Sequence, residues 1–320
     1  MNKCAILTAA AMAMWMGCGS TSTGTAGTGG TAGVGGGAGG TGGTARACAT
    51  DIDVSEVQEF GPETPERTEG ITFDAEGNLY VSALFAAAND ELLLVSTAGT
   101  TETAAEAESI LGLESHVNGI IAAGIDTGEL LLIDPVTGES SPIATELGAP
   151  NAVVTTPWDT ILVSDDSIGE SAIDEVTWDG AVSTWSMGVP TPNGMVFSLD
   201  GRTLYVASTF EQPGLWRVPV SEAGEAGVPE KLVAFDPGST PDGVAIDSEG
   251  NVYVALNLPA QIAQVDPDDP DNFTIIAENV DTVASLAFGQ GDFDPCSIYA
   301  TNLFGKQLWR VGIGIPGVEK

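Results

Sequence analysis

Short apolar stretches separated by polar turns dominate the pattern of this chain. Residues 240–257 show it most clearly, because Gly243–Ile246 and Val252–Leu256 are apolar and the polar stretch Asp247–Asn251 separates them. Alternating Val, Ile, Tyr and Ala bounded by Gly, Asp and Asn predicts an antiparallel β-hairpin. A single hairpin is only marginally stable in water, so the pattern matters through its recurrence.

The hairpin recurs along the chain. Related segments begin at Glu69, Asn151, Asn193 and Asp242, and a copy with an insertion precedes the C-terminus. A shorter apolar phrase follows each copy and also occurs from Gly128, after the degenerate copy HVNGIIAAG, whose inner strand could lie further upstream. Six units of three or four short strands without helical periodicity predict an all-β fold, the six-bladed β-propeller. A solenoid is the competing architecture, but six blade-sized units close well into a ring.

The N-terminus has a different character. Residues 4–16 are almost wholly apolar and follow a short positive start, yet they are too few to span a bilayer. Residues 1–17 therefore predict a secretory signal peptide. The sequence MGCGS at Met16–Ser20 resembles the bacterial lipoprotein processing box, which predicts cleavage before a lipidated Cys18. An ordinary signal peptide that is cut elsewhere is the alternative.

The next segment, residues 18–46, consists largely of Gly, Thr and Ala. Such a composition lacks the apolar side chains that offset the entropy of ordering, so it predicts a flexible tether. The propeller then occupies residues 47–320, which is long enough for one large β domain. These features predict an exported bacterial lipoprotein that is anchored to a membrane and faces either the periplasm or the cell surface.

The cysteines fit an oxidising compartment. Cys4 lies in the signal segment and Cys18 is the predicted lipidation site, so Cys48 and Cys296 remain for the folded domain. One stands at the start of the domain and the other in its last unit. A ring must join its ends, so we predict a Cys48–Cys296 disulfide that clamps the closure. Two separate buried thiols are the alternative, and the spacing of the cysteines gives no zinc motif.

The charge is strongly one-sided, with nine Lys and Arg against 45 Asp and Glu. Such a surface repels phosphate backbones, so nucleic acid is excluded as a partner. Polybasic contact with anionic lipids is equally disfavoured, which leaves the lipid anchor as the only expected membrane attachment. The single histidine, His116, excludes Ser-His-Asp machinery and multi-histidine metal sites, and it reads as a loop or rim residue. The oligomeric state is not indicated.

Polar residues recur at one position of the repeat. Glu69, Asn151, Asn193 and Asp242 each stand just before the first apolar strand of a unit. In a propeller these strands line the central channel, so the four side chains converge on one axis. Their oxygen-only ligand set suits Ca²⁺, or another divalent cation less well, at one central site. Ordinary turn chemistry is the alternative for the Asn and Asp residues, but it does not explain a glutamate in the same register.

Four of these segments resemble motifs of one family. The segments EGITF, PNAVV, PNGMVFSLDGRTLYVAS and TPDGVAIDSEGNVYVA resemble the senescence marker protein/gluconolactonase (regucalcin-like) family and its relative diisopropyl fluorophosphatase. The resemblance implies a six-bladed propeller with one catalytic divalent cation on its axis. It places Glu69, Asn151, Asn193 and Asp242 among the metal ligands.

The resemblance also implies an activity, the metal-assisted hydrolysis of a small lactone or ester in the channel. Asp242 would be its general base, or its nucleophile in a phosphatase-like variant. Ala152 stands where the family often has Asp, and Ala149 stands where sugar lactonases place an Arg that grips the substrate. These departures weaken gluconolactone as the substrate more than they weaken the metal site. The alternative is a non-catalytic binding or scaffold propeller whose metal is structural or absent.

Overall fold

A computed structural model describes residues 46–169 and 172–319. The predicted signal peptide, the lipidation site at Cys18 and the tether up to residue 45 lie outside these residues, as does Lys320. Ala47–Lys320 forms one compact unit. In the part of the chain that is described, no helix is long and apolar enough to cross a membrane.

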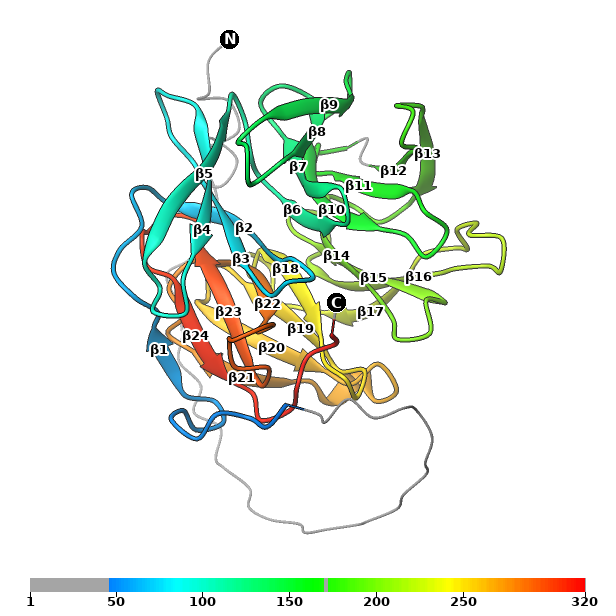
Figure 1. Cartoon of the computed structure of the whole chain (residues 1–320). Helices are drawn as coiled ribbons and strands as arrows, with labels where there is room; N and C mark the ends of the chain where they lie inside the picture. The colour runs from blue at the N-terminus through cyan, green and yellow to red at the C-terminus, as the bar shows by residue number, and fades with distance from the viewer. Residues whose placement is uncertain (1–45, 170–171, 320) are drawn as a thin grey trace. The chain divides into compact units, whose positions relative to one another are not determined.

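The strands form six antiparallel sheets of four strands each, as Figure 1 shows. The first sheet consists of β2 (Thr68–Phe73), β3 (Leu79–Ala83), β4 (Asp90–Val95) and β5 (Thr101–Ala107). The second consists of β6 (Leu113–His116), β7 (Gly119–Gly124), β8 (Glu129–Ile133) and β9 (Ser140–Ala144). The third consists of β10 (Pro150–Thr155), β11 (Ile161–Asp165), β12 (Ala172–Val176) and β13 (Val182–Met187). The fourth and fifth are β14 (Pro192–Phe197), β15 (Thr203–Ser208), β16 (Gly214–Pro219) and β17 (Glu230–Ala234); and β18 (Pro241–Ile246), β19 (Val252–Leu256), β20 (Gln261–Val265) and β21 (Thr274–Glu278), with the short 3₁₀ helix η1 (Pro270–Asn272) before β21. The sixth is β22 (Val283–Phe288), β23 (Ser297–Asn302), β24 (Trp309–Gly312) and, outermost, β1 (Val57–Glu59).

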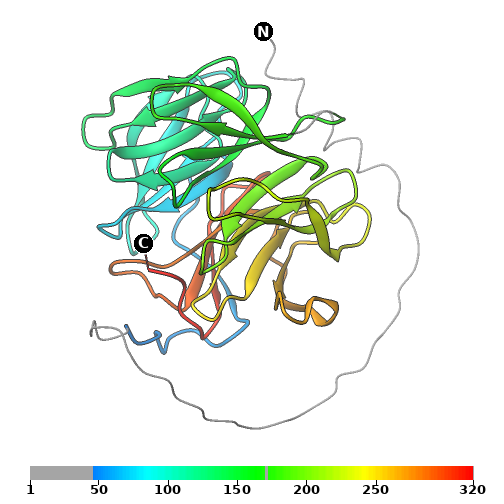
Figure 2. The same ribbon diagram turned by 90° about the vertical axis from the view of Figure 1, so that its right-hand side faces the viewer.

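The first strand of each sheet lies on the inside of a closed ring. β2 contacts β6, β6 contacts β10, and the series continues through β14, β18 and β22 back to β2. Figure 2 shows the ring turned by 90°. This closed cycle of six sheets confirms the predicted six-bladed propeller and excludes a solenoid, in which the first and last units would not meet.

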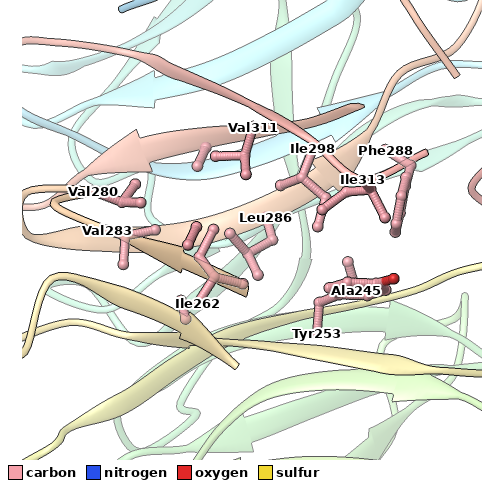
Figure 3. Close-up of a cluster of buried hydrophobic side chains, with 13 residues drawn as sticks. Ala245, Tyr253, Ile262, Val280, Val283, Leu286, Phe288, Ile298, Val311 and Ile313 are labelled. Atoms are coloured by element: carbon pink, nitrogen blue, oxygen red, sulfur yellow. The ribbon is translucent and has the colours of Figure 1, made fainter. Parts of the chain in front are cut away.

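The core is divided into six apolar clusters, one between each pair of neighbouring sheets. Figure 3 shows the cluster between the fifth and sixth sheets, where Tyr253 and Ile262 pack against Leu286 and Ile298. The cluster that joins the sixth sheet to the first holds Phe73 edge-on against Phe293, with 5.0 Å between ring centroids. Burial of apolar side chains between every pair of blades stabilises the whole ring.

Three connections close the ring at the chain ends. The N-terminal strand β1 pairs antiparallel with β24 and completes the sixth sheet, as the blue and red strands show in Figure 1. A disulfide joins Cys48 to Cys296 with 5.2 Å between their Cα atoms, as predicted. Beside it, the Arg310 guanidinium contacts the carboxylates of Asp51 and Asp294, each at 3.0 Å. The sequence did not reveal that the domain's first strand belongs to its last blade.

The degenerate second unit contains the missing inner strand. β6 (Leu113–His116) lies upstream of the phrase from which that unit was recognised and pairs with β7. His116 ends this strand, and its ring packs at a tilt against Trp178 in the turn between β12 and β13, with 4.3 Å between ring centroids. The histidine therefore lies where the inner strand leaves the channel, at the opposite end from the four predicted ligands.

Candidate metal centre in the central channel

The four predicted ligands lie on four different inner strands at the same structural position. Glu69 is on β2, Asn151 on β10, Asn193 on β14 and Asp242 on β18. In each strand the pairing register shifts at this point, between Thr68 and Ile71 in β2 for example, and it shifts likewise in the other three. Such a bulge re-aims the side chain that it carries. Each acceptor is therefore directed by the same local distortion.

The inner strands of neighbouring blades pack closely beside the predicted ligands. The residue after Asp242 is Gly243, and a Cβ there would stand 2.5 Å from the Cα atom of Ser285 in the next blade. The glycine after Asn193, Gly194, would likewise meet the Asp242 carbonyl oxygen at 2.5 Å. Glycine follows both ligands because the backbones of neighbouring blades approach too closely for a side chain.

Three of the four predicted ligands have buried oxygen atoms without a partner. Glu69 is 4% exposed and Asn151 and Asp242 are 6% exposed. Within the described residues, Oε2 of Glu69, Oδ1 of Asn151 and Oδ1 of Asp242 have no hydrogen-bond donor. A buried acceptor without a donor costs about 1–3 kcal/mol, and more when it is charged. Their shared position makes a cation the simplest group that would satisfy all three.

The fourth ligand, Asn193, is held by its neighbours. Its Nδ2 donates to Oγ1 of Thr209 at 3.1 Å, and Thr209 in turn donates to the carbonyl oxygen of Pro241 at 2.8 Å. Burial raises the pKa of Asp242, and a hydrogen bond from the Asn193 side chain opposes this rise. Asn193 is therefore linked to Thr209 in its own blade and to Asp242 in the next.

Burial dominates the electrostatics of these carboxyls. It raises the pKa of Asp242 to about 7, against an ordinary value of 3.8, despite the hydrogen bond from Asn193. Burial also raises the pKa of Glu69 well above its usual range, and the negative charges of Asp242 and Asp166 raise it further. These carboxyls thus favour protonation unless a positive charge is bound between them.

Asp166 is the site residue that sequence reasoning missed. It follows β11, and its Oδ2 accepts a hydrogen bond from Nδ2 of Asn151 at 3.4 Å. Its Oδ1 is buried without a partner, and burial together with the charge of Asp242 raises its pKa well above the usual range. Its only sequence signal is the acidic pair Asp165–Asp166 directly after an apolar strand, at a position where no other unit has an acid.

The channel provides room for a ligand. A cavity of about 410 Å³ is lined by the inner strands and includes Glu69, Asn151 and Asn193. Its walls are otherwise largely apolar, with Met195, Phe197 and Phe288 among them. A mostly apolar cavity with a few convergent polar groups is the usual form of a small-molecule site.

The chemistry of the donor set fits a hard divalent cation. Two carboxylates and two amide oxygens are ligands that Ca²⁺ accepts in flexible geometry, with waters completing the shell. Across residues 46–169 and 172–319, no three His, Cys, Asp or Glu side chains form a metal-binding group by themselves. A site at this position would therefore use the two asparagine amides beside the carboxylates.

Comparison with known proteins assigns the fold a family. The family model described as the SMP-30/gluconolactonase/LRE-like region matches residues 67–298, which include all four predicted ligands and Asp166. Pentonolactonase XacC of Haloferax volcanii is 28% identical over 225 residues, covering 68% of this chain and 75% of that protein.

Solved structures show the same fold. A gluconolactonase of Xanthomonas campestris superimposes with a TM-score of 0.66 at 16% identity, covering 86% of this chain and 99% of that one. The calcium-binding protein regucalcin of Agrobacterium tumefaciens has a TM-score of 0.66 at 22% identity, covering 80% and 94%.

Proposed function

The chain belongs to the SMP-30/gluconolactonase/LRE-like family, and from that premise we propose that it is a metal-assisted hydrolase of small lactones or esters. One observation carries the proposal. Acceptor side chains on four inner strands share one bulge position, and three of them bury an oxygen without a donor. A propeller that served only as a scaffold has no need of these costly groups.

Glu69, Asn151, Asn193 and Asp242 would hold the cation. A bound Ca²⁺ would polarise the carbonyl oxygen of the substrate and keep the surrounding carboxylates ionised. The names of the relatives support this choice: one is a calcium-binding protein, and two others are named for lactone hydrolysis.

Asp242 would serve as the general base. Its carboxylate takes a proton from water, and the water oxygen forms a bond to the carbonyl carbon of the lactone. The bond between that carbon and the ring oxygen then breaks, and the Asp242 carboxyl returns the proton to the leaving alkoxide. The product is the open-chain hydroxy acid. Attack by Asp242 itself, as a nucleophile, is the variant that fits a phosphoester or activated ester.

The substrate class is narrower than the family as a whole. Ala149 and Ala152 carry no group that could bind a polyhydroxylated substrate, and the cavity walls include Met195, Phe197 and Phe288. We therefore propose a lactone or ester with limited polar decoration rather than gluconolactone itself.

The test is hydrolysis of a panel of aldonolactones, alkyl-substituted lactones and aryl esters, with added Ca²⁺ and with chelator. Asp242→Asn keeps an oxygen ligand at the same place, as Asn151 and Asn193 do, so it should still bind the cation at saturating Ca²⁺. It should lose hydrolysis by a factor of about 100 or more because the base is gone. Activity that survives both the chelator and Asp242→Asn would refute the proposal.

The absence of a gripping side chain at Ala149 favours one alternative, a propeller that binds a ligand or cation without turning it over. Calcium binding with no turnover on any substrate of the panel would select it. We also propose that the protein is exported and anchored through a lipid on Cys18. Mass spectrometry of the mature N-terminus, with Cys18→Ser as the control, tests this proposal.

A further inference from the structure

Asp166 occupies a position that can be compared between blades. In five blades the residue after the second strand donates its backbone N–H to a carbonyl oxygen near the start of the inner strand. That carbonyl belongs to the residue two positions before the predicted ligand, or before its counterpart in the sixth blade. These five bonds are 2.9–3.2 Å long, and the donors are Leu84, Asp166, Thr209, Asn257 and Leu303. The backbone at Asp166 is therefore the same as in its counterparts, and only the side chain differs.

Neutral side chains at this position connect neighbouring blades. In the fourth blade Oγ1 of Thr209 accepts from the Asn193 amide and donates to the carbonyl oxygen of Pro241 in the fifth. In the fifth blade Nδ2 of Asn257 donates to the carbonyl oxygen of Val283 in the sixth, at 3.1 Å. In these two blades the position supplies a donor across the gap to the next blade, whereas Leu84 and Leu303 in the first and sixth blades have apolar side chains.

The third blade departs from this arrangement. An ionised carboxylate has no hydrogen to donate, so Asp166 accepts from the Asn151 amide but cannot bond to the backbone of the fourth blade. A threonine would hold the Asn151 amide equally well, as Thr209 holds Asn193. Holding that amide therefore does not explain the charge, and the buried, unpartnered Oδ1 has no structural benefit.

The surroundings of the carboxylate indicate its use. The charge of Asp166 acts on Glu69, and the charge of Asp242 acts on Asp166. Because Asp166 accepts from Nδ2 of Asn151, the amide oxygen of that residue is directed away from it, and this oxygen is one of the unpartnered acceptors. The hydrogen bond from the Asn151 amide to the Asp166 carboxylate indicates a role that acts through that predicted ligand.

We propose that Asp166 is a positioning residue of the cation site. It fixes the Asn151 amide with the oxygen toward the channel and places a third negative charge behind the ligands. The inference rests on the proposed cation site and deepens it. Outer groups of this kind commonly change metal affinity by about 10- to 100-fold.

The substitution Asp166→Thr separates the two roles. It copies the fourth blade, so it should still hold the Asn151 amide and should gain the bond to the next blade. It removes the carboxyl group that can carry a charge. We expect the cation-free protein to melt at an equal or higher temperature, because the buried Oδ1 without a partner is lost. We expect calcium to bind about tenfold to a hundredfold more weakly.

The matched control is Asp165→Asn, one residue earlier. Oδ1 of Asp165 accepts from the backbone N–H groups of Ala149 and Ser167, at 3.2 and 2.9 Å, and an asparagine oxygen can accept both bonds. The control removes the same formal charge beside the site. We expect it to change calcium affinity by about fivefold or less, as for partly exposed charges.

The measurement is calorimetric titration of the full-length protein in mild detergent with calcium chloride, together with melting temperatures in chelator. Weaker binding and undiminished stability in Asp166→Thr would support the proposal. Unchanged affinity in Asp166→Thr, an equal loss in Asp165→Asn, or a lower melting temperature of the cation-free Asp166→Thr protein would overturn it. If the unmodified protein binds no calcium, the cation site itself fails and the role of Asp166 fails with it.

Discussion

The pH dependence of stability follows from the buried carboxyls of the channel. Folding raises the pKa of Asp242 from 3.8 to about 7, and the pKa values of Glu69 and Asp166 move in the same direction. Between these limits the unfolded chain has lost the proton and the folded chain keeps it. The folded state therefore binds more protons, and stability falls as pH rises from about 4 to about 7.

The magnitude can be worked out for Asp242 alone. A change of about three pKa units corresponds to about 4 kcal/mol of unfolding free energy, at about 1.4 kcal/mol per unit. For a domain of this size each kcal/mol shifts the melting temperature by about 2 °C, so the expected fall is about 8 °C. Asp51 and Asp294 have pKa values below their ordinary value of 3.8, so they make stability rise with pH. Their effect is confined to pH values below about 4, outside the range in which Asp242 acts.

The assay is calorimetric melting in chelator at intervals between pH 4.5 and 7.5. Asp242→Asn should flatten the dependence and raise the melting temperature at pH 7, because it removes the buried ionisable group but keeps its shape. Saturating calcium should also reduce the slope, since a bound cation keeps the carboxylates ionised at lower pH. A melting temperature that stays level or rises from pH 4.5 to 7 in chelator would refute this reasoning. An equal slope in Asp242→Asn would also refute it.

Three further predictions concern the frame that holds the site. The Cys48–Cys296 disulfide spans 248 residues, and its reduction should lower the free energy of unfolding by about 2–5 kcal/mol while β1 stays paired with β24. Melting curves with and without reductant measure this loss of stability. Gly243→Ala places a Cβ 2.5 Å from the backbone of β22 and should cost about 2 kcal/mol or more in a denaturant titration, and an unchanged midpoint would contradict it. Thr209→Val leaves the Pro241 carbonyl oxygen without its donor and should cost about 1–3 kcal/mol, with Thr209→Ser as the variant that retains stability.

Much of the fold follows from local sequence. The hairpin at residues 241–256 has the alternation and turn residues that its strands require, and similar copies specify the other blades. Local patterns cannot indicate pairings between distant segments, and for this reason β1 was not recognised as the outer strand of the sixth sheet. The inner strand β6 ends in polar Ser115 and His116, which weakened its apolar signal.

The candidate site was predictable to the extent that it repeats. Glu69, Asn151, Asn193 and Asp242 share a register, so one position in the repeat identified all four, and the structure places all four at the same bulge. Asp166 belongs to a different position, where the other blades carry neutral residues. Only the hydrogen bond to Asn151 across the hairpin shows that this acid faces the site.

The central claim is that the inner-strand acceptors hold a divalent cation. Calcium titration calorimetry on the purified protein, against the Glu69→Gln/Asp242→Asn double variant, tests it most directly. The double variant keeps side-chain oxygens at both positions but loses both charges, so micromolar or tighter binding in the unmodified protein should weaken by at least about 100-fold. No binding in the unmodified protein, or equal binding in the double variant, would contradict the claim.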